Sequence, residues 1–248
     1  CLMAAYGIIG FPLTHSFSKQ YFTKKIERDV IPDAVYHSFP LTSIEDLPEL
    51  LKSNPLLRGL SVTIPYKEKV LKYLDQLSDE VSEIGATNCI KISGNKLKGF
   101  NTDITGFEKS FVRFLRPEHK KALILGTGGA SKAVQYVLKK LGLDFLVVSR
   151  SGSDKINFIQ YKQISSAIIN EYKIVINCTP LGMSPDESSC PEIPYCLLTP
   201  DHYLYDLVYQ PAKTLFLQKG EEQGSVICNG YEMLIIQAEE NWRIWNEA

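Results

Sequence analysis

The amino-acid sequence predicts an α/β protein of two domains, and three observations support this prediction. Apolar strand-like segments alternate with helical segments, which is typical of right-handed crossovers and a mostly parallel sheet. The alternation forms two series, one over the first hundred residues and one from Lys121 onward. A chain of 248 residues with 44% apolar residues is also long enough to build two hydrophobic cores.

The first series contains three strand-like segments, each followed by a helical one. We expect strands at 6–10, 34–41 and 57–64, and helices at 17–30, 43–52 and 66–75. Ser43 followed by Asp46 resembles a capping box, and Pro65 suits the residue just before a helix. Segments 87–92 and 96–101 flank the turn residues 93–95, which predicts a hairpin.

A connecting helix and a second series follow. Ile104, Phe107, Phe111 and Phe114 recur at helical spacing, which predicts an amphipathic helix over 104–116 between the two domains. The second series has apolar strand-like segments at 122–126, 145–149, 173–178, 203–207 and 225–230. The first and fourth of these strands precede helices.

The last segment, 230–248, is predicted to be a packed helix. Its residues Leu234, Ala238, Trp242 and Trp245 fall on one helical face. Periodicity leaves open which of the two domains this helix packs against.

Charge and composition restrict the classes of partner. The chain has 27 Lys and Arg against 28 Asp and Glu, without a block of five like charges, which disfavours nucleic-acid and membrane-surface binding. No apolar run approaches the roughly 18 residues of a membrane span, so we expect a cytoplasmic protein. The six cysteines form no CxxC pair, so we expect reduced thiols and no metal site. Monomer and homodimer both remain open.

A glycine-rich turn indicates a Rossmann domain. In ALILGTGGASKA (122–133), Gly126, Gly128 and the small residue Ser131 lie between an apolar strand and a helix. Gly126 permits a tight bend, Gly128 lets the backbone approach a pyrophosphate, and the helix N-terminus supplies N–H donors. The alternative is a glycine-rich turn that binds nothing.

The end of the next strand indicates which cofactor is bound. An NAD site would place Asp or Glu there, whereas this chain has Ser149, Arg150 and Ser151. An arginine between two hydroxyls suits the 2′-phosphate of NADP, so we predict NADP. Asp154 nearby would weaken this attraction.

Nine short motifs resemble one family over the whole chain. In order, they are GFPLTHSFS, SVTIPYK, GATN, NTD, GTGGAS, SRS, NCTPLGM, YDLVYQP and NGYEMLIIQA. This series resembles the shikimate dehydrogenases. The resemblance implies NADPH-dependent reduction of 3-dehydroshikimate to shikimate, in the pathway to chorismate and aromatic amino acids. It also implies a substrate-binding domain (1–103 plus 231–248), a Rossmann NADP-binding domain (104–230) and an active-site cleft between them.

The resemblance also implies roles for individual residues. Lys67 and Asp103 would form the catalytic pair, and Ser16 and Ser18 would bind the substrate carboxylate. The substrate ring hydroxyls would be held by Thr63, Lys67, Asn88, Asp103 and Gln237, with Tyr209 closing the pocket. The cofactor would contact Gly126, Thr127, Gly128, Gly129, Ala130, Ser149, Arg150, Ser151, Thr179, Met183, Leu207 and Gly230. Of these, Thr179 would lie in a turn under the nicotinamide, and Met183 would form an apolar wall.

The sequence departs from the family pattern at three places. Lys19 stands where a proline is usual, Ser61 where an asparagine is usual, and Asp154, followed by Lys155, where a second basic residue is common. The first two changes remove no predicted ligand. The third puts the strength of the NADP preference in doubt.

Each predicted site residue also has a purely structural interpretation. Lys67, with Lys69 and Lys72 nearby, could lie on a solvated helix face. Asp103 could cap the helix that follows it, and Ser16 and Ser18 could cap the first helix. His15 is interpreted as structural.

The sequence leaves two rival functions open. One is a quinate/shikimate dehydrogenase that tolerates NAD, which Arg150 disfavours. The other is a dehydrogenase-like sensor that binds ligand without turnover. Such a sensor would be expected to lack Lys67 or Asp103, and this chain has both.

Overall fold

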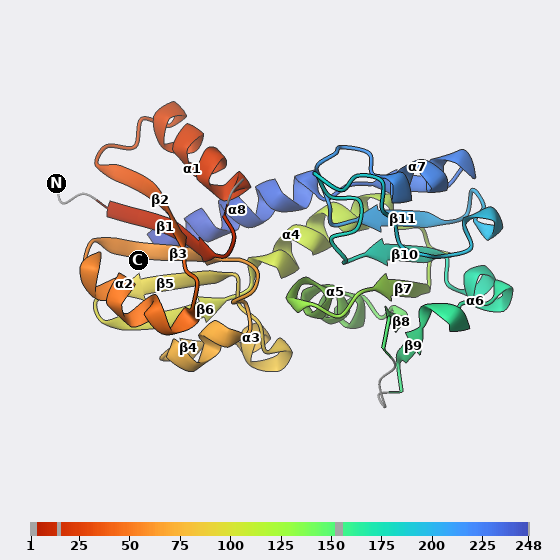
Figure 1. Cartoon of the computed structure of the whole chain (residues 1–248), viewed down its shortest axis with the longest axis horizontal. Helices are drawn as coiled ribbons and strands as arrows, with labels where there is room; N and C mark the ends of the chain where they lie inside the picture. Colours follow the sequence, from red (N-terminus) through yellow and green to blue (C-terminus); the bar gives the residue numbers. More distant parts are fainter. Residues whose placement is uncertain (1–3, 14–15, 152–155, 248) are drawn as a thin grey trace. The chain divides into compact units, whose positions relative to one another are not determined.

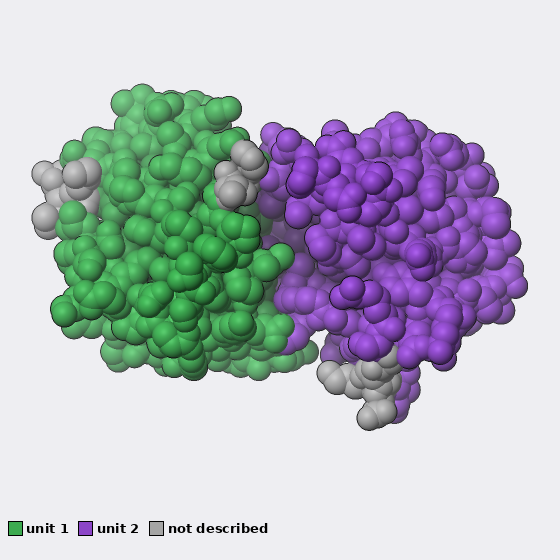
Figure 2. All heavy atoms as spheres, in the orientation of Figure 1, with its two compact units in different colours: residues 1–102, 237–248 green, residues 103–236 purple. Residues whose placement is uncertain are grey.

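The computed structural model describes residues 4–13, 16–151 and 156–247 (Figure 1). These residues form two compact units (Figure 2). Unit 1 comprises Cys1–Thr102 and Gln237–Ala248, and unit 2 comprises Asp103–Ile236. Each unit is built around its own six-stranded sheet, and most strand pairs are parallel. The predicted α/β class is therefore confirmed.

Unit 1 combines a parallel half-sheet with an antiparallel hairpin. Its strands are β1 (Ala4–Gly10), β2 (Ala34–Pro40), β3 (Leu57–Val62), β4 (Gln76–Leu77), β5 (Cys89–Ser93) and β6 (Lys96–Phe100). Its helices are α1 (Phe17–Arg28), η1 (Ile44–Asp46), α2 (Leu47–Ser53), η2 (Lys69–Tyr73), α3 (Asp79–Ile84) and the C-terminal part of α8 (Tyr231–Asn246). The strand order is β2-β1-β3-β5-β6-β4. The predicted hairpin is confirmed, because β5 and β6 pair antiparallel across a turn at Gly94.

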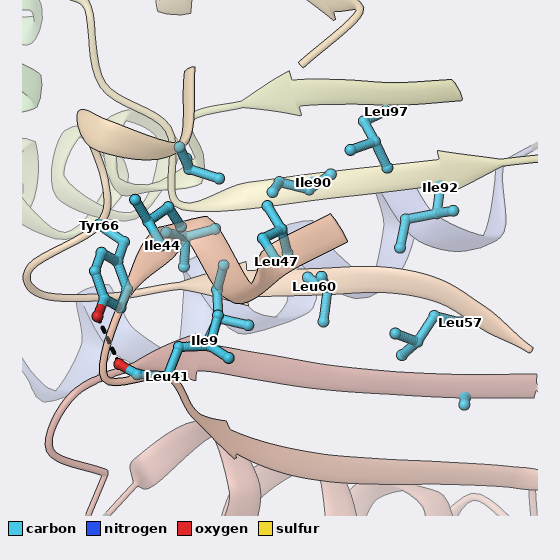
Figure 3. Packing of buried hydrophobic residues seen from close by; sticks show 13 residues of the cluster. Ile9, Leu41, Ile44, Leu47, Leu57, Leu60, Tyr66, Ile90, Ile92 and Leu97 are labelled. Carbon is cyan, nitrogen blue, oxygen red and sulfur yellow. Dashed lines mark hydrogen bonds between the residues drawn. The ribbon is translucent and has the colours of Figure 1, made fainter. Parts of the chain in front are cut away.

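Buried side chains cover both faces of the unit 1 sheet. Ile8 and Ile9, adjacent on β1, point to opposite faces and belong to different buried clusters. The cluster around Ile9 also contains Ile44 of η1 and Leu47 of α2 (Figure 3). The cluster around Ile8 contains residues of α1 and α8, including Trp245, whose indole N–H donates to the Ile90 carbonyl (3.0 Å). The terminal helix therefore packs into unit 1 at its C-terminal end.

The helix predicted over 66–75 is wrong in type and length. This segment forms a turn and then the short 3-10 helix η2. The backbone N–H of Asp75 donates to the Leu97 carbonyl (2.9 Å), and its carboxylate accepts from the Leu97 N–H (2.7 Å). These bonds pull the chain into the sheet edge beside β6. The tertiary pairing thus overrides the helical pattern.

The capping box predicted at Ser43 is also wrong in detail. Ser43 caps the 3-10 helix η1 and accepts from the backbone N–H of Glu45 (3.3 Å). Asp46 instead ends η1 and precedes α2 without a side-chain cap bond. Pro48 in the first turn of α2 explains why the regular helix begins only there.

Unit 2 contains an all-parallel sheet. Its strands are β7 (Lys121–Leu125), β8 (Asp144–Ser149), β9 (Phe158–Gln160), β10 (Ile174–Asn177), β11 (Tyr203–Asp206) and β12 (Val226–Cys228). Its helices are α4 (Thr102–Phe111), η3 (Val112–Phe114), α5 (Gly129–Lys140), η4 (Tyr161–Gln163), α6 (Ser166–Glu171), η5 (Tyr195–Leu197), α7 (Leu215–Glu222) and the start of α8. The strand order β12-β11-β10-β7-β8-β9 places β7 next to both β8 and β10.

The predicted connecting helix is confirmed as α4, with a tighter last turn. Phe107 and Phe111 are fully buried, and Phe111 stacks on Tyr203 of β11 (ring centroids 5.4 Å apart). Phe114, by contrast, is 42% exposed, because the helix has changed to the 3-10 form at η3. The apolar spacing therefore describes the first two turns well and the last turn poorly.

Two negative findings apply to the described part of the chain. None of its helices combines the length and apolar character needed to cross a bilayer. Among the same residues, no three His, Cys, Asp or Glu side chains gather closely enough to hold a metal ion.

Candidate active site

The N-terminus of α1 carries two hydroxyls. Ser16 is the N-cap and accepts from the Lys19 backbone N–H (3.3 Å). Ser18 lies in the first turn of this helix and is half-buried. That turn contains no acidic residue, so the partial positive charge of the helix end is not offset there. This end suits a carboxylate, and Ser16 also performs the capping role considered above. His15 lies outside the described residues.

The segment after β3 holds Lys67 in a fixed turn. Thr63 donates its backbone N–H to Ile9 (3.0 Å) and accepts from the Tyr66 N–H (2.9 Å). The buried Tyr66 hydroxyl donates to the Leu41 carbonyl (2.5 Å; Figure 3), and the Lys67 carbonyl accepts from Thr87 (2.8 Å). Lys67 is half-buried, whereas Lys69 is exposed at the start of η2. Lys67 therefore lies in a turn and not on the face of a regular helix.

Asp103 lies in the first turn of α4, and its side chain is buried. The preceding Asn101 donates its amide to the Ala86 carbonyl (2.9 Å). The Asn101 Oδ1 is the one buried side-chain polar atom without a hydrogen-bond partner among the described residues. A buried acceptor of this kind requires an explanation, such as a bound water or a functional role.

Two predicted substrate residues of unit 1, Asn88 and Gln237, lie within hydrogen-bond distance of each other. The Asn88 amide donates to Gln237 Oε1 (3.5 Å) and to the Thr102 hydroxyl (3.0 Å), while Asn88 Oδ1 accepts from the Thr102 backbone N–H (2.7 Å). All three side chains are buried. Asn88 of the GATN motif, Thr102 of the NTD motif and Gln237 therefore lie in one polar cluster.

Three further residues join this cluster, and the sequence analysis missed them as site residues. The Tyr36 hydroxyl donates to Ser61 Oγ (2.9 Å), and Asn241 Nδ2 donates to the same oxygen (3.3 Å). Asn241 Oδ1 accepts from the Thr102 hydroxyl (2.6 Å). A signal was present for Asn241, because it lies four residues after Gln237 and hence on the same helical face.

In unit 2, the glycine turn after β7 has the form expected of a pyrophosphate site. Gly126 has φ +107°, a conformation that favours glycine, and an added Cβ would lie 3.0 Å from the Thr179 side chain. Gly128 is the N-cap of α5 and has open space around its missing side chain. Helix α5 therefore begins without a side-chain cap and without an acidic residue in its first turn. Thr127 is exposed, and Gly129 and Ala130 form the half-buried first turn.

The segment after β8 presents Arg150 to solvent. Ser149 ends the strand and is buried, and its hydroxyl donates to the Ser151 carbonyl. This bond closes a tight turn from which the exposed Arg150 projects. Asp154 and Lys155 lie outside the described residues.

A buried carboxylate links the loops that follow β10 and β11. Asp206 Oδ1 accepts from Asn177 Nδ2 (2.9 Å) and the Val208 N–H (3.0 Å), and Oδ2 accepts from the Thr214 hydroxyl (2.5 Å). Asn177 Oδ1 in turn accepts from the hydroxyl of Thr179 (2.6 Å). Burial raises the pKa of Asp206 to about 6, although all three donors favour the charged form.

The remaining predicted residues flank these loops. Gly230 packs so closely on Leu207 that an added Cβ would lie 2.2 Å from the Leu207 carbonyl oxygen. Met183 is 45% exposed after the turn at Pro180. Tyr209 is half-buried, and burial raises the pKa of its hydroxyl. The carboxyl ends of β7, β10 and β11 thus carry most of the predicted cofactor residues of unit 2, as expected for a parallel sheet.

Comparison with known proteins identifies the family to which the chain belongs. Residues 8–90 match the family model of the shikimate dehydrogenase substrate binding domain. The shikimate dehydrogenase (NADP(+)) of Aquifex aeolicus is 35% identical, over 97% of this chain and 90% of its own length. The chain belongs to the shikimate dehydrogenase family. The predicted resemblance is confirmed.

Solved structures extend the family relationship to the fold. The shikimate dehydrogenase of Thermus thermophilus, in complex with NADP(H) and shikimate, has a TM-score of 0.86 and 30% identity, covering 98% of this chain and 94% of that chain. A quinate dehydrogenase of Corynebacterium glutamicum, in complex with NAD, has a TM-score of 0.86 and 25% identity, covering 99% of this chain and 94% of its own.

The structure shows the contacts of two of the three residues that depart from the family pattern. The Lys19 ammonium donates to the backbone carbonyl of Tyr36, so it ties α1 to β2. Ser61 offers its hydroxyl oxygen to Tyr36 and Asn241 within the polar network. The third departure, at Asp154, lies outside the described residues.

Proposed function

We propose that the protein is an NADP-dependent shikimate dehydrogenase that reversibly reduces 3-dehydroshikimate to shikimate in the pathway to chorismate and aromatic amino acids. The observation that carries this proposal is the buried network of unit 1, which joins the predicted substrate residues Asn88 and Gln237. Amides and hydroxyls held in this way suit a ligand that carries several hydroxyl groups.

In this proposal, unit 1 binds the substrate. The substrate carboxylate lies at the N-terminus of α1, where Ser16 and Ser18 supply hydroxyls and the helix supplies partial positive charge. Thr63, Asn88 and Gln237 hold the ring hydroxyls.

Unit 2 binds the cofactor, and the residues present fit it. The open space at Gly128 and the uncapped start of α5 suit a pyrophosphate. Arg150, with Ser149 and Ser151, binds the 2′-phosphate of NADP, because its guanidinium matches phosphate oxygens well. NADPH, when bound, supplies the hydride for the carbonyl carbon of the substrate.

Lys67 and Asp103 perform the proton chemistry. Reduction of a ketone places negative charge on its oxygen, and a positioned cation stabilises that charge. The Lys67 ammonium donates a proton to this oxygen, which completes the alcohol; in the reverse direction, Lys67 accepts the proton from shikimate. The Asp103 carboxylate accepts a hydrogen bond from a neighbouring substrate hydroxyl and orients the ammonium. The fixed turn around Lys67 suits such a role, because its backbone carbonyl is held by Thr87.

The proposal is tested by following cofactor reduction with shikimate and with quinate, each with NADP and with NAD. We expect turnover of shikimate with NADP. Comparable turnover of quinate with NAD would instead favour the quinate/shikimate dehydrogenase alternative. The structurally similar quinate dehydrogenase of Corynebacterium glutamicum is 25% identical to this chain. Calorimetric binding of both ligands without any turnover would favour a sensor.

A further inference from the structure

Asp206 is a fully buried carboxylate that takes no part in the proposed proton chemistry. It ends β11, where Oδ1 accepts from Asn177 Nδ2 (2.9 Å) and the Val208 N–H (3.0 Å), and Oδ2 accepts from the Thr214 hydroxyl (2.5 Å). A carboxylate is costly to bury even when donors surround it. Its retention at this place therefore requires a reason.

The carboxylate fixes the orientation of the Asn177 amide. Asn177 ends β10 and is paired with Asp206 across the parallel ladder. An ionised carboxylate can only accept hydrogen bonds, so the Asn177 NH₂ group must face it. Asn177 Oδ1 then accepts from the backbone N–H (3.0 Å) and the hydroxyl (2.6 Å) of Thr179, and the second Nδ2 proton goes to the Leu181 carbonyl (3.4 Å). Every polar atom of the Asn177 side chain thus has a partner.

These bonds hold residues 178–182 in a compact turn. The Thr179 hydroxyl, which donates to Asn177, also accepts from the Leu181 N–H (3.3 Å). At the end of the turn, the Gly182 N–H donates to Ser189 Oγ (2.9 Å), and Gly182 has φ +84°. The conformation of this turn therefore depends on the side chain of Asn177 at its start.

The turn lies against the glycine turn after β7. The Cys178 N–H donates to the Leu125 carbonyl (2.9 Å), which extends the sheet pairing beyond β10. A Cβ added at Gly126 would lie 3.0 Å from the Thr179 side chain and 3.3 Å from the Cys178 carbonyl oxygen. The Thr179 side chain thus occupies the space that a side chain at residue 126 would need. The position of Thr179 and the shape of the proposed pyrophosphate site are consequently linked.

We propose that Asp206 is a positioning residue for cofactor binding: its carboxylate orients Asn177, and Asn177 holds residues 178–182 in the conformation that receives NADP. This inference rests on the proposed function, in which Thr179 and Met183 contact the cofactor. Asp206 itself does not touch the cofactor in this account. A turn that is held before the ligand arrives loses less conformational freedom on binding, which favours affinity.

Two substitutions remove the positioning. Asp206→Leu, of similar size, removes the acceptor for Asn177, and Asn177→Ala removes the acceptor for Thr179. Each should raise the NADP Kd by about 10-fold or more and leave the shikimate Kd within about 2-fold of the wild type, because the lost hydrogen bonds belong to the cofactor-binding unit. Both Kd values are measured by calorimetry, and folding is checked by urea unfolding.

Asp206→Asn is the conservative variant and should restore cofactor binding. Its amide oxygen can still accept from Asn177 and Val208, while its NH₂ group can donate to the Thr214 hydroxyl oxygen. The NADP Kd of this variant should stay within about 3-fold of the wild type, because the orientation of Asn177 is kept. A folded Asp206→Asn that binds NADP as weakly as Asp206→Leu would contradict the positioning role.

Tyr205→Phe is the matched control. Tyr205 precedes Asp206 on β11, is fully buried and points to the opposite face of the sheet. Its hydroxyl is hydrogen-bonded to Ser110 Oγ (2.7 Å), so the variant also removes one buried hydrogen bond of this strand, but away from the turn. The control should lower stability and leave the NADP Kd unaltered.

The outcomes distinguish this inference from the proposed function. A wild type that binds NADP, with Asp206→Leu and Asn177→Ala folded and of unchanged NADP Kd, would overturn the positioning role alone. Equal weakening of NADP and shikimate binding would indicate a general loss of structure and would overturn it as well. If Asp206→Leu fails to fold, Asn177→Ala decides by the same criteria. A wild type that does not bind NADP would overturn the proposed function, and the positioning role with it.

Discussion

The buried carboxylate of Asp206 predicts a specific dependence of stability on pH. Its pKa is raised from 3.8 to about 6 by burial in unit 2, so the folded state holds the proton more tightly than the unfolded state does. The stability from this proton is complete below the unfolded pKa and is lost as the pH rises through about 6. Between about pH 4.5 and about pH 7, this loss amounts to about 2 kcal/mol of unfolding free energy.

Asp206→Asn isolates this contribution, because an amide cannot ionise. We expect urea unfolding of the wild type to lose about 2 kcal/mol more than the variant over that pH range. Burial lowers the pKa of His202, so this residue makes the folded protein more stable as the pH rises. Subtracting the curve of the variant from that of the wild type removes this effect, because both proteins contain His202. Parallel stability curves for the two proteins would refute the assignment of Asp206 as the buried ionisable link between Asn177 and Thr214.

Two further predictions concern the binding sites. Arg150→Ala should reduce the preference for NADP over NAD by about 1.5 to 3 kcal/mol, the scale of a hydrogen bond to a charged group, as measured by kcat/KM with each cofactor; equal use of both cofactors by the wild type would contradict it. Replacing Ser16 and Ser18 together with Ala should raise the shikimate KM strongly and leave the NADP KM unchanged. A lower melting temperature with an unchanged shikimate KM would show that these serines serve only the helix.

Long periodic segments were predictable from the sequence, and short elements were not. The apolar strands at β1, β7 and β10 are buried and continuous, so composition alone identifies them. The strands β4 and β9 have only 2 and 3 residues, and their place is decided by pairing with β6 and β8. The helix prediction for residues 66–75 was wrong for the same reason, because Asp75 pairs with Leu97 at the sheet edge.

Site residues could be predicted from the sequence where a short motif imposes a specific requirement on the backbone or the side chain. The turn at Gly126 requires a positive φ (+107°) that other residues rarely adopt, so this position could be recognised without a structure. Tyr36 and Ser61 carried no such signal, since each fits an ordinary strand. Asn241 was signalled only by its place one helical turn after Gln237. Their common network exists because the chain brings β2, β3 and α8 together from distant parts of the sequence.

Lys67 is proposed to supply the proton to the reacting oxygen, and one kinetic measurement tests this role most directly. Lys67→Ala should lower kcat for shikimate by about 10²- to 10⁴-fold with a small change in KM, the range for loss of a positioned acid or base. Lys69→Ala is the control, because Lys69 is exposed on η2 and surface substitutions have small effects. If Lys67→Ala keeps the wild-type kcat, as Lys69→Ala is expected to do, the catalytic role of Lys67 is contradicted.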